Sequence, residues 1–165
     1  MGRKKYVEAD RLLRPDPRYG DRAVSRFINC VMKSGQKAPA QRCVYDAFDV
    51  IDERLAKETA PEAPKNALEL FHRAVENVMP YVEVRSKRIG GANYQVPMQV
   101  SRKRQQSLSI RWILEAVRSE RGRPMHQRLA DELYNAARGE GKAMSTRDQT
   151  HKMAEANRAF AHFAN

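Results

Sequence analysis

Arginine and lysine are the side chains whose number and spacing in this sequence indicate a chemistry. The 165 residues include 31 of them against 20 aspartates and glutamates, which gives a formal net charge of +11 and a pI near 10.0. Such a charge attracts polyanions, so nucleic acid or an anionic membrane surface is the expected partner. No run approaches the roughly 18 apolar residues of a membrane span, and the N-terminus lacks the apolar core of a secretory signal. We therefore expect a cytoplasmic protein that does not span a membrane and whose partner is nucleic acid or an anionic membrane surface.

The positive charge is concentrated in two blocks of the chain. Residues 1–45 hold 11 basic and 4 acidic side chains, and residues 81–128 hold 11 and 3. Residues 46–80 hold 4 and 8, and the remainder is balanced. A single charged run is usually a solvated face, but two strongly basic blocks around an acidic one favour two surfaces for a polyanion.

The second basic block contains a regular arginine spacing. Arg104, Arg111 and Arg118 lie seven residues apart, so on a helix they form one stripe that flanks the apolar face of Ile110–Val117. Arginine stems can lie along an apolar edge while their guanidinium groups make bidentate contacts to phosphate. We expect this stripe to face nucleic acid.

Trp112 and Leu108 fall on the side of this helix away from its main apolar face. Either another layer of the protein covers them, or Trp112 is offered to a nucleic-acid base for stacking. We favour burial.

The stretch VEVRSKRIGGANYQVP, residues 82–97, has the alternation of a β-hairpin. Placing the apolar residues on one face sets Val84 opposite Val96 and leaves Ile89-Gly90-Gly91 as the loop. A three-residue loop or a glycine bulge is therefore expected in preference to a tight Gly-Gly turn. Only the base of the hairpin is apolar. We therefore expect the distal part to stand free of the chain or to contact something outside it. Three basic side chains lie toward its tip: Arg85, Lys87 and Arg88.

No arrangement of residues indicates catalysis or metal binding. The four histidines lack the paired spacing of a metal-binding helix, and there is no phosphate-binding loop or nucleophile motif. Cys30 and Cys43 are expected to be small core residues. We predict no enzymatic activity, no cofactor, no metal and no small-molecule substrate.

Apolar periodicity predicts a mainly α-helical single domain of about six helices, with the hairpin (residues 81–100) between the third and fourth helices and a basic arm over residues 1–19. Asp21 is the predicted N-cap of the first helix, and Gly35 ends it. Thr146 and Gln149 form the capping box that opens the last helix. Its predicted core positions are Met153, Ala156, Phe160 and Phe163.

Four segments carry a resemblance to a known family. PDPRYG, PYVEVRSKRIGGANYQVP, SIRWILEA and MAEANRAFAHF occur in this order, and the sequence resembles bacterial small-subunit ribosomal protein seven over essentially its whole length. The resemblance implies a helical core with a protruding hairpin. It also implies direct binding to small-subunit ribosomal RNA, nucleation of the 3′ major domain that forms the head of the subunit, and a hairpin beside messenger RNA and the exit-site transfer RNA. Small-subunit ribosomal proteins nine and eleven would be its neighbours.

The resemblance also assigns residues. Together with the arginine stripe, the expected ribosomal RNA contacts are Arg3, Lys4, Lys5, Arg11, Arg14, Lys33, Lys37, Arg102, Lys103, Arg104, Arg111 and Arg118. The expected contacts of the hairpin with messenger and transfer RNA are Arg85, Lys87, Arg88, Gly90, Gly91, Asn93 and Tyr94.

A second class of function fits the same charge. A free-standing nucleic-acid-binding regulator would expose one recognition helix and usually form a symmetric dimer. The basic residues are instead spread over an arm, a loop, a hairpin and a helix, which suits contact with a folded RNA from several sides. We therefore expect a structural ribosomal protein.

Overall fold

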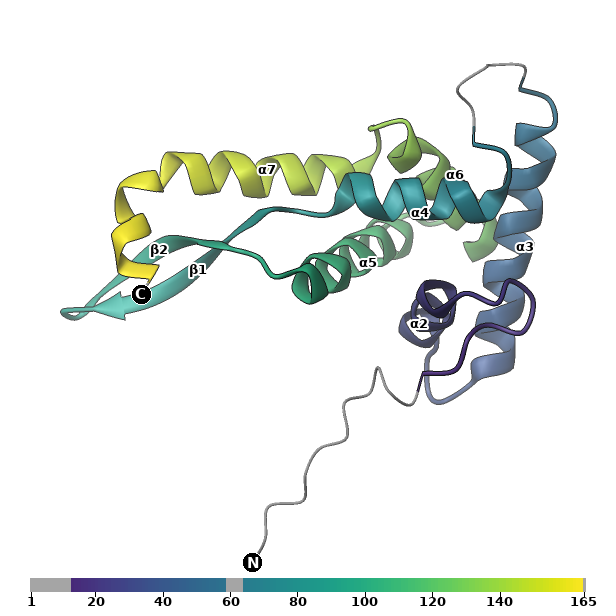
Figure 1. Cartoon of the computed structure of the whole chain (residues 1–165), viewed down its shortest axis with the longest axis horizontal. Helices are drawn as coiled ribbons and strands as arrows, with labels where there is room; N and C mark the ends of the chain where they lie inside the picture. Colours follow the sequence, from purple (N-terminus) through teal and green to yellow (C-terminus); the bar gives the residue numbers. More distant parts are fainter. Residues whose placement is uncertain (1–12, 59–63, 165) are drawn as a thin grey trace, which may run out of the picture. The chain divides into compact units, whose positions relative to one another are not determined.

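A computed structural model of the chain describes residues 13–58 and 64–164. The described residues form six α-helices, one antiparallel hairpin and a short 3-10 helix, η1 (Figure 1). Their bounds are α2 Arg22–Val31, α3 Lys37–Leu55, α4 Ala67–Val78, β1 Val82–Ile89, β2 Ala92–Gln99, α5 Arg102–Ser119, α6 Met125–Ala137, α7 Lys142–Ala156 and η1 Arg158–Ala164. The mainly helical fold with a hairpin between the third and fourth described helices is confirmed.

The chain divides into two compact units, residues 1–45 and residues 46–165. In the first unit, α2 begins at Asp21, whose Oδ1 accepts hydrogen bonds from the backbone N–H groups of Ala23 at 2.6 Å and Val24 at 2.9 Å. This confirms the predicted N-cap. The helix ends at Val31, four residues before the predicted stop at Gly35.

The second unit is built on α4, α5 and α6, which contact one another, while α7 contacts all three. Phe48 of α3 and Phe71 of α4 pack with ring centroids 5.6 Å apart, and both are fully buried. Helix α5 buries the predicted face of Ile110, Ile113, Leu114 and Val117.

Helix α7 begins at Lys142, four residues before the predicted capping box. Its N-cap is Gly141, with φ of 97°, and the carboxylate Oε1 of Glu132 in α6 accepts the N–H of Ala143 at 2.8 Å. Thr146 lies inside the helix, where its hydroxyl donates to the carbonyl of Lys142 at 3.0 Å. The capping-box prediction is wrong because a side chain from another helix satisfies the N-terminal donors of α7.

The hairpin closes with a two-residue turn at Gly90 and Gly91, which have φ of 57° and 91°. Positive φ at both positions gives a turn whose twist matches the flanking strands. Ile89 pairs with Ala92, so the predicted three-residue loop and its register are wrong. The pairs farther from the turn are Arg88–Asn93, Lys87–Tyr94, Ser86–Gln95, Arg85–Val96, Val84–Pro97, Glu83–Met98 and Val82–Gln99.

The register prediction failed because it assumed that the buried face of the hairpin is entirely apolar. Val96 is 1% exposed, but the other well-buried residue on its face is Glu83, at 8%. Val82 and Val84 are only half-buried and lie on the opposite face.

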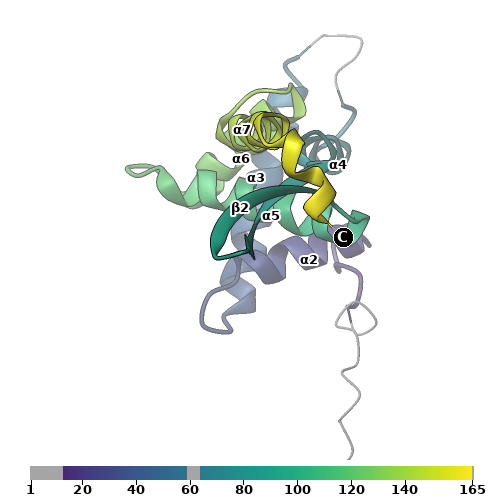
Figure 2. The same ribbon diagram turned by 90° about the vertical axis from the view of Figure 1, so that its left-hand side faces the viewer.

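The chain itself covers part of the distal hairpin, whereas the turn extends beyond that cover (Figure 1). Helix α7 runs along the hairpin and η1 turns back onto β2 (Figures 1 and 2). The last predicted helix therefore consists of two elements, and its aromatic residues Phe160 and Phe163 lie on η1, where they pack on Tyr94 of the hairpin. The core prediction is wrong for Met153, which is 52% exposed, and for Ala156, which is also exposed.

The two cysteines do not share the predicted core environment. Cys30 is exposed and Cys43 is half-buried. Cys30 is on α2, whose buried residues next to it are Phe27, Ile28 and Val31. The core prediction is therefore wrong for Cys30.

Candidate nucleic-acid interface

One face of the hairpin, which we call the open face, carries exposed polar side chains toward the turn. Arg88 pairs with Asn93 and Ser86 pairs with Gln95, and all four residues are exposed. A guanidinium and an amide side by side can contact a phosphate and the edge of an unpaired base. The open face is thus the part of the hairpin best suited to nucleic acid.

The other face, which we call the covered face, contains a carboxylate held by two arginines. Glu83 Oε1 lies 2.5 Å from Arg85 Nη2 and 2.7 Å from Arg85 Nε, and its Oε2 lies 3.2 Å from Arg104 Nη2. Burying a carboxylate is costly unless it is paired and hydrogen bonded. Arg85 and Arg104, both predicted to bind RNA, therefore compensate the charge of Glu83.

The tip half of the covered face contacts the C-terminal segment. Lys87 Nζ donates to the backbone carbonyl of Phe163 at 2.7 Å. The ring of Tyr94 lies 5.2 Å from that of Phe160 and 5.6 Å from that of Phe163, centroid to centroid. Two further residues that were predicted to contact RNA therefore have partners within the protein.

Helix α5 carries the other predicted cations of the second unit. Lys103, Arg111 and Arg118 are exposed. Arg102 is exposed and lies 3.4 Å from Glu76, with both side chains about 70% accessible, so solvent screens this pair. Leu108 is buried and Trp112 is half-buried, as favoured over an exposed stacking ring. The exposed cations of α5 are therefore the candidates for phosphate contacts.

In the first unit, the structure brings Arg14 and Lys37 to the rim of one cavity, while Lys33 lies in the loop before α3. All three side chains are exposed. Ser34 and Gly35, between the two lysines, have φ of 51° and 75°. The predicted RNA-binding residues Arg3, Lys4, Lys5 and Arg11 lie outside the described residues.

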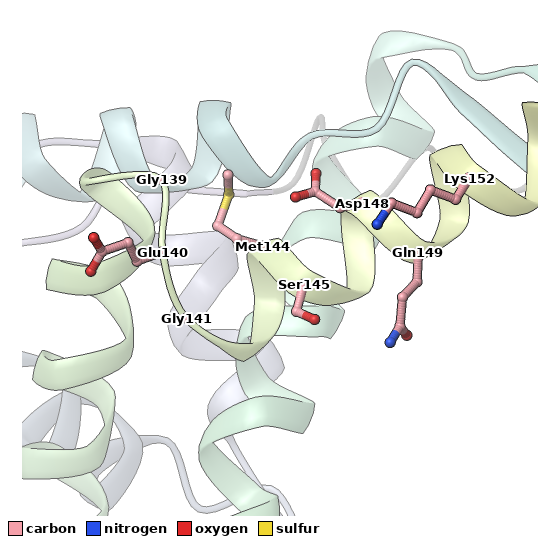
Figure 3. Close-up of a pocket in the computed structure, with 8 residues that line it drawn as sticks. All are labelled: Gly139, Glu140, Gly141, Met144, Ser145, Asp148, Gln149 and Lys152. Carbon is pink, nitrogen blue, oxygen red and sulfur yellow. The ribbon is translucent and has the colours of Figure 1, made fainter.

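A second cavity, of about 350 Å³, lies at the connection of α6 and α7 (Figure 3). Its polar lining does not converge: Glu140 is directed away from the side chains of α7, and Ser145 and Gln149 lie on the opposite side of that helix from Asp148. Over residues 13–58 and 64–164, no group of three metal-ligating side chains is found. None of the described helices combines the length and apolarity of a membrane span.

The sequence of the chain can be compared with those of known proteins. The family model of ribosomal protein S7p/S5e matches residues 3–158 of this chain. The chain belongs to this family. Small ribosomal subunit protein uS7 of Rhodopirellula baltica is 55% identical over 149 residues, which cover 90% of this chain and 91% of the relative. The uS7 of Salinibacter ruber is 51% identical over 163 residues, 99% of each chain, and that of Thermotoga neapolitana is 50% identical over 153 residues, 93% and 94%.

Membership in the S7p/S5e family agrees with the sequence-based identification. The protein is a ribosomal protein and not an enzyme, as predicted. The family also favours a ribosomal component over a free-standing regulator.

In this S7p/S5e protein, the sequence patterns did not identify the residues that act as partners within the protein for some of the predicted RNA-binding side chains. Glu83 is the single acid among the strand residues of β1 and β2. Its isolation among basic residues was the one available indication that it pairs with arginines. No local pattern indicated that Phe160 and Phe163 would cover Tyr94, because their contact spans more than 60 residues of sequence.

Proposed function

We propose that this protein is a structural constituent of the small ribosomal subunit that binds small-subunit ribosomal RNA directly. The observation that carries the proposal is the exposure of Arg102, Lys103 and Arg111 on α5, a helix whose apolar face is buried. Phosphate contacts supply most of the affinity of such proteins. The names of the relatives support the assignment to the small subunit.

At a finer level, we propose that the whole chain acts as one RNA-binding domain in the cytoplasmic ribosome. Binding nucleates the 3′ major domain, with small-subunit proteins nine and eleven as neighbours. The hairpin reaches messenger RNA and the exit-site transfer RNA through its open face. Arg88 and Asn93 support this role because they are exposed near the turn.

The salt dependence of binding to a head-domain RNA transcript tests the proposal. With six or more phosphate contacts, the log–log slope of affinity against salt concentration should be at least about −4. Replacing Arg102, Lys103 and Arg111 by Gln should make the slope less steep by about one unit for each lost contact. The matched control is Glu115→Gln, which removes an exposed charge of the opposite sign from the same helix. A slope near zero for the unaltered protein would reject the proposal.

A further inference from the structure

The cavity beside Arg14 and Lys37 lies wholly within the first unit and has a volume of about 340 Å³. This is near the lower end of the range for small-ligand pockets, roughly 300–1,000 Å³. The turn before α2, helix α2 and the first turns of α3 supply its lining. The lining residues are Leu13, Arg14, Pro15, Pro17, Ser25, Asn29, Lys37 and Gln41.

The lining combines apolar walls with cations and lacks acids. Leu13, Pro15 and Pro17 provide apolar surface, and the exposed Arg14 and Lys37 bring two positive charges. This lining matches a flat, uncharged group that has a negative charge on either side. One nucleotide in an RNA chain has this chemistry, because its base is flat and uncharged and the adjoining phosphates are negatively charged.

A hydrogen-bond network orients one of the two amides in the cavity. The Tyr45 hydroxyl donates to Oδ1 of Asp16 at 2.8 Å, and Oδ2 of Asp16, a residue only 3% exposed, accepts the N–H groups of Arg18 and Tyr19. Burial and the hydrogen bond to Asp16 raise the pKa of Tyr45 to about 12, so its hydroxyl stays protonated. The side chain of Gln41 also hydrogen bonds to Tyr45.

Asn29 is the second amide of the cavity and is half-buried on α2. An asparagine presents a carbonyl acceptor next to an N–H donor. This pair matches the N6–H donor and N7 acceptor of adenine, whereas guanine presents two acceptors on the same edge.

We propose that this cavity takes an unpaired adenine of the small-subunit ribosomal RNA, with Asn29 on its N6/N7 edge and Arg14 and Lys37 on the adjoining phosphates. The inference rests on the proposed function and names the recognition element of that RNA. Unpaired bases that leave the stack are the usual targets of sequence-specific RNA recognition by proteins.

Analogue interference tests the assignment. Head-domain RNA transcripts that carry 7-deaza-adenosine, which lacks N7, are bound to the full-length protein and to Asn29→Ala. At one adenine position, the loss of N7 should weaken binding of the unaltered protein about tenfold. The same position should have no effect on Asn29→Ala, which has already lost the contact.

Two further variants keep the test decisive. Asn29→Asp has nearly the same shape but no donor to N7, so it should also be insensitive to the analogue. It replaces Asn29→Ala in the test if that variant fails to fold. Lys33→Gln removes a cation from the same unit outside the cavity, and it should lower the affinity while leaving the interfering adenine unchanged.

The outcomes separate this inference from the proposed function. If the unaltered protein binds the RNA with the expected salt dependence but no adenine interferes, or if the interference persists in both Asn29 variants, the assignment of an adenine to the cavity is overturned and the proposed function stands. If the unaltered protein does not bind the RNA, the proposed function fails and the inference fails with it.

Discussion

The two faces of the hairpin share one backbone but have different surroundings. On the covered face, Arg85 pairs with Glu83, and Lys87 donates to the carbonyl of Phe163. On the open face, Arg88 and Asn93 are exposed. Adjacent basic residues of one strand therefore differ in their partners, and we propose that this difference decides which cation contacts RNA.

Glu83 also joins the hairpin to helix α5. Its second oxygen accepts from Arg104, which is on the first turn of α5, so one carboxylate ties two elements together. Because the side chain of Glu83 is 10% accessible, removing it would leave Arg104, at 39%, without its counter-charge. The covered face thus has a structural role, and we propose the open face as the binding surface.

Glu83→Gln is expected to have the largest effect on stability. Breaking a buried ion pair by removing one partner costs roughly 3–5 kcal/mol, and the partial exposure of both arginines lowers our expectation to about 2 kcal/mol. Urea denaturation measures this loss, and the salt slope of RNA binding should not change.

Glu76→Gln is the matched control for this variant. Its carboxylate also pairs with an arginine, Arg102, but both side chains are about 70% accessible, so the change should be below about 0.5 kcal/mol. Equal losses in the two variants would contradict the distinction between the two pairs.

The contact between the hairpin and η1 should contribute less. A double-mutant cycle with Tyr94→Ala and Phe160→Ala should give a coupling free energy of about 1 kcal/mol, since the two rings pack at 5.2 Å. The same cycle with Asn93→Ala and Phe160→Ala should give none, because Asn93 is on the open face. Coupling in both cycles would mean that η1 does not distinguish the faces.

Glu132 is a buried carboxylate that differs from Glu83 in its partners, and its replacement should have the smallest effect. Burial raises the pKa of Glu132, although the N–H of Ala143 opposes this. The folded state therefore binds the proton more tightly than the unfolded state. This group contributes stability below the ordinary pKa of glutamate and loses it as the pH rises through the raised pKa.

Glu132→Gln keeps an acceptor for Ala143 and removes the charge. The variant should be at least as stable as the unaltered protein at pH 7, with the difference shrinking as the pH falls to 4. Thermal melts across this range measure it, with the exposed Glu140→Gln as control. A variant that is less stable at neutral pH would show that the charge of Glu132 stabilises helix α7.

Periodicity was enough to predict that the helices exist and where the hairpin lies, although not where every helix begins and ends. Asp21 caps α2 as expected, and the apolar spacing of α5 matches its buried face. These features depend on residues within one or two turns of each other, so a single sequence contains them.

The features that were predicted wrongly depend on distant residues. The hairpin register follows the Gly90–Gly91 turn and a buried acid that needs Arg104 from α5, and the start of α7 depends on Glu132 from α6. For the same reason, the sequence indicated which residues are basic but not which of them form contacts within the protein.

The central claim is that the open face contacts RNA and the covered face contacts the protein itself. Photo-crosslinking from two adjacent positions tests it most directly. A benzophenone amino acid is placed at position 88 or at position 87 of the full-length protein, which is then assembled into small subunits and irradiated. The account predicts crosslinks to RNA from position 88 and crosslinks to residues of η1 from position 87. RNA crosslinks of equal yield from both positions, or from position 87 alone, would contradict it.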